Sequence, residues 1–330
     1  MKLTELNKKT GKVCMILIPL LILLAAVEML FLSSDDISRA QVEKQHVFGA
    51  TYMTMNNPYY KVVDSQIRAF LEENGDVLLT RDGTMNQQRQ NEEIKELIES
   101  GAEVIFIACV DWDQVEEGIR YANEAGVPVI AIDTEVKNSD LVTCSVVSNN
   151  YHAGVLCAEH LLANRTGADI LLLEHITAIS GRQRIKGFTD TLASHPEFRI
   201  VGSGESDGQI ENAMPVMAEL LREHPEADVV MALNDPTAFG AMAAIEGAGL
   251  SGEILVYSVD GSPEAKTMVA EQMMTATGAP FPGRLASEAT RAAYEILNGN
   301  EVEKEIIIPV ELITEENVDR FGISGWQDEQ

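Results

Sequence analysis

Residues 91–109, NEEIKELIESGAEVIFIAC, carry the pattern that decides the fold. The first half of this stretch places Ile94, Leu97 and Ile98 at helical spacing, so one face of a helix is apolar. The second half ends in Val104–Cys109, a short apolar run that is typical of a buried strand. A helix that leads directly into a buried strand is the repeating unit of a parallel α/β sheet.

The same alternation of strand and helix continues on both sides of this stretch. Strands that alternate with helices form parallel sheets with helices on both faces. Ten predicted strands fit two open sheets of five or six strands better than one sheet. The predicted strands are Val47–Met53, Val77–Thr80, Val104–Cys109, Val129–Ile132, Leu141–Val147, Ile170–Leu173, Arg199–Ser203, Val229–Leu233, Ile254–Val259 and Met273–Thr277.

The composition is that of a folded, acidic protein with more than one domain. The chain has 330 residues, of which 45% are apolar, and this length suggests two domains at ~100–200 residues each. It carries 52 acidic against 24 basic residues, a net charge of −28. Nucleic-acid binding requires a basic surface, so we expect no nucleic-acid partner.

The N-terminus predicts a membrane anchor. Residues 1–12 are a basic tail expected to stay in the cytoplasm, and residues 13–32 are apolar except for Glu28, long enough to span a bilayer. Residues 33–45 read as a polar linker, which leaves the remainder of the chain extracytoplasmic. The alternative is a cleaved signal peptide, whose apolar core is usually shorter, at ~7–15 residues.

The four cysteines indicate no essential disulfide. Cys14 falls in the predicted anchor, and it does not follow an apolar run as a lipid-modified cysteine would. Cys109, Cys144 and Cys157 form an odd set with apolar neighbours, which favours small buried side chains.

Polar residues follow several predicted strands at the point where each strand ends. In open parallel sheets, ligands bind beyond the carboxyl ends of the strands, so these residues are the candidate site. Amides, carboxylates, a guanidinium group and aromatic rings suit the hydroxyls and C–H faces of a sugar. The segments are Asn56-Asn57-Pro58-Tyr59-Tyr60, Asp133, Ser148-Asn149-Asn150, Ser180-Gly181-Arg182, Asn234-Asp235-Pro236 and Asp260-Gly261.

Over roughly residues 46–315 the chain resembles the ribose-type periplasmic sugar-binding (type I) family, which is related to the ligand domains of lactose-repressor-like regulators. Six motifs occur in the family's order. They are Asn-Asn-Pro-Tyr-Tyr at 56–60, Gly126–Ile130 leading to Asp133, Ser148-x-Asn150, Arg182-x-Arg184-x-x-Gly187-Phe188, Asn234-Asp235 and Asp260-Gly261.

This resemblance implies an α/β fold of two doubly wound parallel-sheet domains joined by a three-segment hinge. The apolar segment 13–32 would precede this fold as one transmembrane helix. The expected N-terminal lobe is residues 46–147 plus 280–308, and the expected C-terminal lobe is residues 148–279 plus 309–330. We expect this chain to have no enzymatic activity, cofactor or metal of its own and to be a monomer.

The resemblance also implies the function and its residues. A small neutral monosaccharide would bind in the cleft and be delivered to an ABC permease; the alternative is a sensing subunit that reports to a sensor histidine kinase. The sequence does not identify the sugar. Cys109, Thr134 and Ala279-Pro280 stand where the family often has hydrogen-bonding side chains, and Gly208 stands where it often has an aromatic ring. The implied ligand-binding residues are Asn57, Tyr59, Tyr60, Asp133, Ser148, Asn150, Arg182, Asn234 and Asp260.

Each of these residues also has a purely structural interpretation. Asn57, Asp133, Ser148 and Asn150 are residue types that cap helices. Tyr59 and Tyr60 suit the core of a first helical turn, and Arg182 a solvated helix start. Asn234-Asp235 and Asp260-Gly261 are good turn pairs.

Two motifs favour an enzyme, and neither stands. Gly204-Glu205-Ser206-Asp207-Gly208 matches the nucleophile elbow of a hydrolase. In that fold an acidic residue and then a histidine follow the serine on later strands. The last histidine here, His224, already lies at the end of the next predicted helix, so the chain order excludes a hydrolase triad. The glycines at 202, 204 and 208 resemble a dinucleotide-binding loop, but they do not follow the first strand of the fold. The acidic residue that such a loop requires at the end of the next strand is also missing. Among the histidines, only His152 and His160 have a spacing close to that of metal ligands, and no turn that carries a carboxylate ligand lies between them. We therefore expect no metal site.

Overall fold

The computed structural model describes residues 45–326. The predicted tail at 1–12, the anchor at 13–32 and nearly all of the linker at 33–45 therefore lie outside the described residues. Between residues 45 and 326, no helix combines the length and the apolar character needed to cross a membrane.

The first domain is built on a six-stranded sheet with the order β11-β5-β4-β3-β1-β2. All of its strand pairs are parallel. Strands β3, β4 and β5 are buried along their whole length, as expected for a sheet covered on both faces. The strands are β1 (Val47–Tyr52), β2 (Val77–Asp82), β3 (Val104–Ile107), β4 (Val129–Ile132), β5 (Cys144–Ser148) and β11 (Glu305–Ile308).

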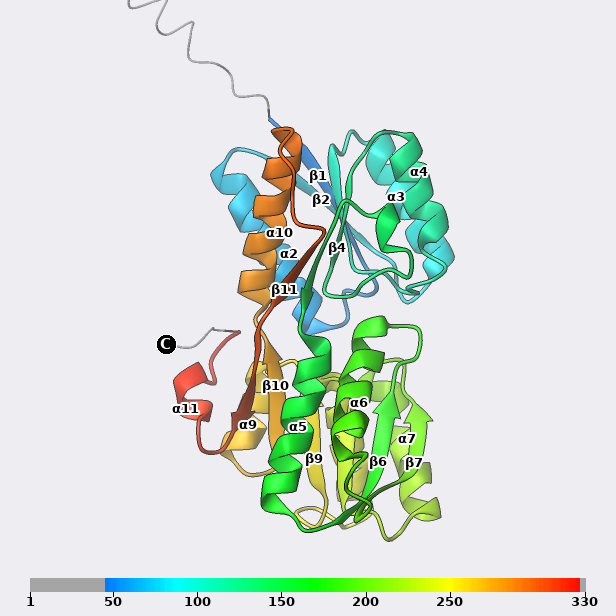
Figure 1. The fold of residues 1–330 in the computed structure, drawn as a ribbon, viewed down its shortest axis with the longest axis vertical. Helices are drawn as coiled ribbons and strands as arrows, with labels where there is room; N and C mark the ends of the chain where they lie inside the picture. Colours follow the sequence, from blue (N-terminus) through cyan, green and yellow to red (C-terminus); the bar gives the residue numbers. More distant parts are fainter. Residues whose placement is uncertain (1–44, 327–330) are drawn as a thin grey trace, which may run out of the picture. The chain divides into compact units, whose positions relative to one another are not determined.

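Helices cover both faces of this sheet (Figure 1). The helices α2 (Pro58–Glu73) and α10 (Pro282–Leu297), far apart in sequence, pack side by side over one apolar core. The helices α3 (Gln87–Glu99) and α4 (Glu116–Glu124) enclose a second core on the other face. A short 3₁₀ turn, η1 (Ser139–Leu141), precedes β5.

The second domain has the same architecture around the sheet β12-β10-β9-β8-β6-β7. One face carries α5 (Asn150–Asn164) and α6 (Ile179–Leu192), and α7 (Ile210–Glu223), α8 (Asp235–Gly247) and α9 (Pro263–Ala270) lie on the other. A short helix, α11 (Val318–Phe321), follows β12. The strands are β6 (Ala168–Glu174), β7 (Phe198–Glu205), β8 (Val229–Ala232), β9 (Leu255–Val259), β10 (Ala276–Pro280) and β12 (Val310–Thr314).

The chain passes between the two sheets three times. It leaves the first sheet after β5 to form α5, returns after β10 to form α10, and leaves again between β11 and β12. Only Pro309 separates β11 from β12, so these strands run from one domain straight into the other (Figure 1).

Two strands were not predicted, and one pairing differs from expectation. Strands β11 and β12 complete the sheets, and β12 pairs antiparallel with β10. The direction follows from the third crossing, because β12 enters the second sheet from the end that faces the first domain. The cysteines of the described chain, Cys109, Cys144 and Cys157, are free and buried.

Candidate functional site

A small cavity lies between the two domains, at the carboxyl ends of their strands. The first domain contributes residues after β1 and β4, and the second contributes residues after β6, β7, β8 and β9. The cavity measures about 30 Å³, room for about two water molecules. Its lining residues include Asn57, Tyr59, Tyr60, Asp133, His175, Arg184, Gly208, Gln209, Asn234 and Asp260.

The first turn of α2 places both tyrosines at the cavity. Pro58 begins the helix, and the Asn57 side chain caps it by accepting a hydrogen bond from the Tyr59 backbone N–H at 2.9 Å. The Tyr60 hydroxyl donates to Asp133 Oδ2 at 2.9 Å, which links α2 to the end of β4. Asn57 therefore has its structural role and faces the cavity as well.

Two aspartates at the cavity stand in unusual backbone conformations. Asp133, directly after β4, has φ +65°, and Asp260, directly after β9, has φ +146°. Positive φ values strain residues other than glycine by about 1–3 kcal/mol, and such strain gathers at functional sites. Both side chains are nearly fully buried. Asp133 does not cap the helical turn that follows it, so the capping interpretation does not account for it, whereas Asp260 stands in a turn with Gly261, which also has positive φ.

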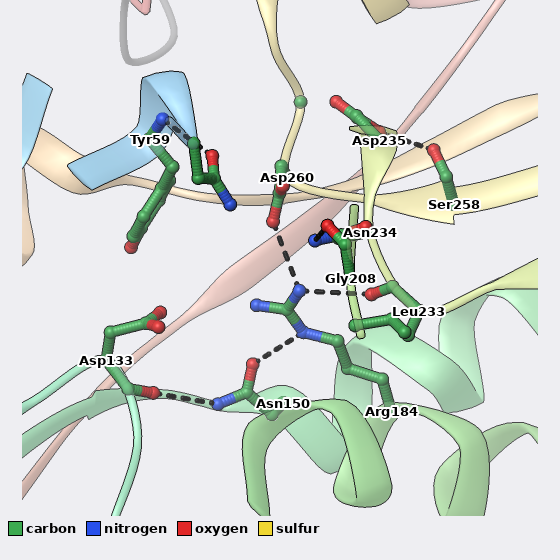
Figure 2. Close-up of polar contacts among 12 residues, drawn as sticks. Tyr59, Asp133, Asn150, Arg184, Gly208, Leu233, Asn234, Asp235, Ser258 and Asp260 are labelled. Carbon is green, nitrogen blue, oxygen red and sulfur yellow. Dashed lines mark hydrogen bonds and ion pairs between the residues drawn. The ribbon is translucent and has the colours of Figure 1, made fainter. Parts of the chain in front are cut away.

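Arg184 on α6 is the buried cation of the site. Its Nε donates to Asn150 Oδ1 at 2.8 Å, and one Nη donates to Leu233 O and to Asp260 Oδ1, each at 3.1 Å. Asn150 in turn donates to the Asp133 backbone oxygen at 3.3 Å. Figure 2 shows the other Nη directed away from these partners, toward the side where Tyr59 and Asp133 lie.

One cation, Arg184, and three carboxyl groups line the cavity; Asp207 is exposed, whereas Asp133 and Asp260 are buried. Burial raises the pKa of the Asp133 and Asp260 carboxyls, and the positive charge of Arg184 opposes both shifts. Burial disfavours the charge of Arg184, yet Asp260 and Asp133 beside it raise its pKa overall. Burial also raises the pKa of Tyr59 and Tyr60, so their hydroxyls stay neutral hydrogen-bonding groups.

Four buried oxygen atoms in or beside the cavity make no hydrogen bond of good geometry with any of residues 45–326. They are Tyr59 Oη, Asp133 Oδ1, Ser148 Oγ and Asp260 Oδ2. A buried polar atom without a partner costs about 1–3 kcal/mol, and folded proteins rarely leave several together. Their convergence from both domains makes this cavity the candidate binding site, and the set of groups suits a ligand rich in hydrogen-bonding groups.

The structure brings most of the predicted residues together. Asn57, Tyr59, Tyr60, Asp133, Asn234 and Asp260 line the cavity. Ser148 and Asn150 are buried beside it, and Asn150 holds Arg184. Asn234 caps α8 through Thr237 N and also holds the Gly208 carbonyl, so its structural role is real as well.

The prediction for Arg182 needs correction. Arg182 is exposed, lies outside the cavity, and places its guanidinium over the Trp112 ring at 5.3 Å from the centroid. Arg184 takes the buried position instead. An α-helix turns about 100° per residue, so residues two apart lie on nearly opposite faces of the helix. Only one arginine of the Arg-x-Arg motif can therefore face the cavity.

Besides Arg184, sequence reasoning missed three polar residues at the cavity: His175, Asp207 and Gln209. His175 comes one residue after β6 ends, so inspecting the residues that follow each strand could have found it. Asp207 belongs to the Gly204–Gly208 segment that resembles a nucleophile elbow, and Gln209 follows it directly. Ser206 in that loop is buried and donates to the Glu174 backbone oxygen at 3.0 Å, a structural role.

Further contacts join the two domains around the cavity. The Trp112 backbone N–H donates to the Thr177 backbone oxygen at 3.2 Å, and Gln183 Nε2 donates to Glu135 Oε1 at 2.9 Å. On another side, Trp326 packs edge-on against Tyr59 with centroids 5.8 Å apart. Lys266 of α9 holds this C-terminal segment through the Gly325 carbonyl at 2.6 Å. The domains are therefore in a closed arrangement.

The described residues contain no group of three or more His, Cys, Asp or Glu side chains placed to hold a metal ion.

The family model described as "Periplasmic binding protein domain" matches residues 48–301. The chain belongs to this family. This periplasmic binding protein is 29% identical over 276 residues to the ribose import binding protein RbsB of Bacillus subtilis, covering 83% of this chain and 88% of that one. The predicted resemblance to ribose-type sugar-binding proteins is confirmed, as is the two-domain α/β fold. The relatives are solute-binding proteins of transporters, which confirms that this binding protein is not an enzyme.

Solved structures show the same fold. An ABC transporter solute binding protein from Mycobacterium smegmatis with bound glycerol superposes with a TM-score of 0.81 at 24% identity, covering 87% of this chain and 99% of that one. The binding protein of the arabinose ABC transporter from Shewanella sp. ANA-3, bound to L-arabinofuranose, gives 0.77 at 25% identity, covering 83% and 93%.

Proposed function

We propose that this periplasmic binding protein binds a small neutral monosaccharide between its two domains and delivers it to an ABC importer. The observation that carries the proposal is the set of buried oxygens without partners at Tyr59, Asp133, Ser148 and Asp260. Carboxylate oxygens accept hydrogen bonds, the free Nη of Arg184 donates them, and hydroxyls do both. Sugar hydroxyls, which also donate and accept, match this mixture.

The charges favour a neutral ligand over an anion. Arg184 is the cation at the cavity, and Asp260 and Asn150 already hold much of it. A phosphate or a free carboxylate would also face Asp133 and Asp260 at close range. The rings of Tyr59 and Tyr60 offer apolar surface for the C–H side of a sugar ring.

The burial of the cavity walls implies that the domains part for the ligand to enter. Tyr59, Asp133 and Asp260 are at most 4% exposed in this closed arrangement, so a monosaccharide needs a more open arrangement of the same walls to reach them. The three crossings at 148–150, 280–282 and 308–310 would serve as the hinge, with lobes of 46–147 plus 280–308 and 148–279 plus 309–330.

A thermal-shift screen of the purified full chain tests the proposal. The panel is D-ribose, D-allose, L-arabinose and myo-inositol, with amino acids and nucleosides as the competing ligand classes. A sugar at about 1,000 times its Kd stabilises the folded state by about 4 kcal/mol, a melting shift of several degrees. Stabilisation by amino acids or nucleosides alone, with every sugar silent, contradicts the carbohydrate assignment.

The route that follows binding has two candidates. The name of the Bacillus relative, a ribose import binding protein, supports delivery to an importer. The apolar segment 13–32 is proposed to anchor the protein to the cell membrane with its binding domains outside, and a protein anchor favours the alternative, a report to a sensor histidine kinase. Deleting the gene separates them: loss of labelled-sugar uptake supports import, and loss of sugar-induced transcription with normal uptake supports sensing.

A further inference from the structure

His175 stands at the cavity wall with half of its hydrogen-bonding capacity in use. The residue lies between β6 and α6 and is only 3% exposed. Its Nε2 is 2.9 Å from the Thr177 hydroxyl, and its Nδ1 has no hydrogen-bond partner among residues 45–326. Because the side chain lines the cavity, this ring is positioned to meet whatever binds there.

The neighbouring Gly208 keeps the Nδ1 side of the ring free. Its φ of +67° suits glycine, and a Cβ at this position would lie 3.3 Å from His175 Nδ1 and 3.2 Å from Asn234 Nδ2. The Gly208 carbonyl is held by the same Asn234 amide, so the loop cannot swing away from the ring without losing that bond. A side chain at 208 would therefore crowd Nδ1, and glycine leaves it accessible to a ligand.

The imidazole is in its neutral form around neutral pH. Burial lowers the pKa of His175, and the carboxylates of Glu205 and Asp207 in the loop after β7 raise it by less. The other charged groups at the cavity are Asp133, Asp260 and Arg184, with Tyr59 and Tyr60 neutral. A neutral imidazole presents Nδ1 either as a donor or as an acceptor, depending on how the Thr177 hydroxyl is turned.

We propose that His175 contacts the bound carbohydrate directly through Nδ1 and that this contact makes carbohydrate affinity fall in acid. The inference rests on the proposed function and adds a specificity residue to it. A sugar hydroxyl complements either tautomer of the neutral ring. Protonation converts Nδ1 to a donor only and creates a cation that a bound sugar would seal from water, so binding requires the neutral form.

The pH dependence follows from this requirement. As the pH drops below the pKa of the unliganded imidazole, a proton must leave His175 before the sugar binds, and affinity falls by up to about tenfold per pH unit. Asp133 and Asp260 also have raised pKa values, so their protonation adds a change of its own in acid. A histidine variant is needed to separate the two.

Calorimetric titration of the purified full chain tests the inference, using the panel sugar with the largest thermal shift. His175→Gln keeps a polar side chain without the titration, and His152→Gln, at an exposed position of α5, is the matched control. Melting of the free proteins checks that both variants fold. If His175→Gln unfolds, His175→Phe, which keeps a flat ring without nitrogen, replaces it.

We expect His175→Gln to weaken binding about five- to tenfold near neutral pH, since one buried hydrogen bond is altered. It should also flatten the affinity loss that the wild type shows as the pH falls below the ordinary histidine value of 6.5, whereas His152→Gln should preserve both the affinity and its pH profile. An unchanged Kd together with an unchanged pH profile in His175→Gln overturns the inference while leaving sugar binding intact. If no panel sugar binds the wild type, the proposed function itself fails, and the inference with it.

Discussion

Exchanging Arg184 for methionine probes the centre of the site, and the same exchange at Arg182 provides a control on the same helix. Methionine keeps much of the apolar stem and removes the guanidinium. At position 184 it removes the bonds to Asn150, Leu233 O and Asp260. At position 182 it removes an exposed cation over the Trp112 ring, an interaction of about 0.5–1 kcal/mol.

The magnitude at Arg184 follows from what is left behind. Removing one partner of a buried ion pair costs about 3–5 kcal/mol, because the other charge stays buried alone. The pKa of Asp260 is already raised by burial, so this carboxyl can take up a proton and avoid part of the cost. We therefore expect a loss near 3 kcal/mol, which lowers the melting temperature of the free protein by about 6–10 °C.

Arg184→Met should also weaken sugar binding, separately from its effect on folding stability. The second Nη of Arg184 points to the side where Tyr59 and Asp133 lie, and its hydrogen bond to a sugar hydroxyl would contribute about 1.5–3 kcal/mol (Figure 2). Calorimetry of Arg184→Met should thus show about 10- to 150-fold weaker sugar binding, and Arg182→Met a change of less than about threefold. Sugar binding lost in Arg182→Met and kept in Arg184→Met would refute this assignment.

Two further exchanges test the walls of the cavity. Asp133→Asn tolerates the positive φ and should weaken sugar binding at least about tenfold. Because the pKa of Asp133 is raised in the folded state, its ionised form destabilises the fold. The ligand-free Asp133→Asn variant should therefore melt at a higher temperature than the wild type around neutral pH. This difference should disappear as the pH falls toward 3.8, the ordinary pKa of an aspartate. A loss of stability at neutral pH would contradict this sign. Trp326→Ala removes the ring that packs on Tyr59 and should reduce the free energy of sugar binding by about 0.5–1.5 kcal/mol, which is several-fold weaker binding. Trp326→Phe keeps an aromatic ring and should restore most of the affinity. Affinity equal to the wild type in Trp326→Ala would show that this contact between the domains does not support sugar binding.

The predicted strands and most of the predicted site residues follow from local sequence. A continuous apolar run such as Val129–Ile132 can be buried on both faces only inside a parallel sheet, and the residue after it must reach the ligand edge. Asp133 was therefore found from its position in the chain. Strand β11 was missed because Glu305–Ile308 is a partly exposed edge strand that stops at Pro309, and short edge strands leave a weak pattern.

The choice between Arg182 and Arg184 shows where sequence reasoning ends. Both arginines belong to the same motif, and the motif does not state which face of α6 is buried. That face is set by packing against α5, where Gly154 and Gly187 allow close contact: a Cβ at Gly154 would lie 1.9 Å from the Arg184 carbonyl oxygen. Only the orientation imposed by this contact turns Arg184 toward Asp260.

The contacts that close the two domains have an optical consequence. The sequence contains two tryptophans, and each lies at one of these contacts: Trp112 under Arg182 of the second domain, and Trp326 against Tyr59 of the first. Parting the domains would strip a cation from one indole and an aromatic neighbour from the other. The intrinsic emission of the unlabelled protein would then report opening and closing from two sides of the cleft at once, and single-tryptophan variants would resolve which side moves first.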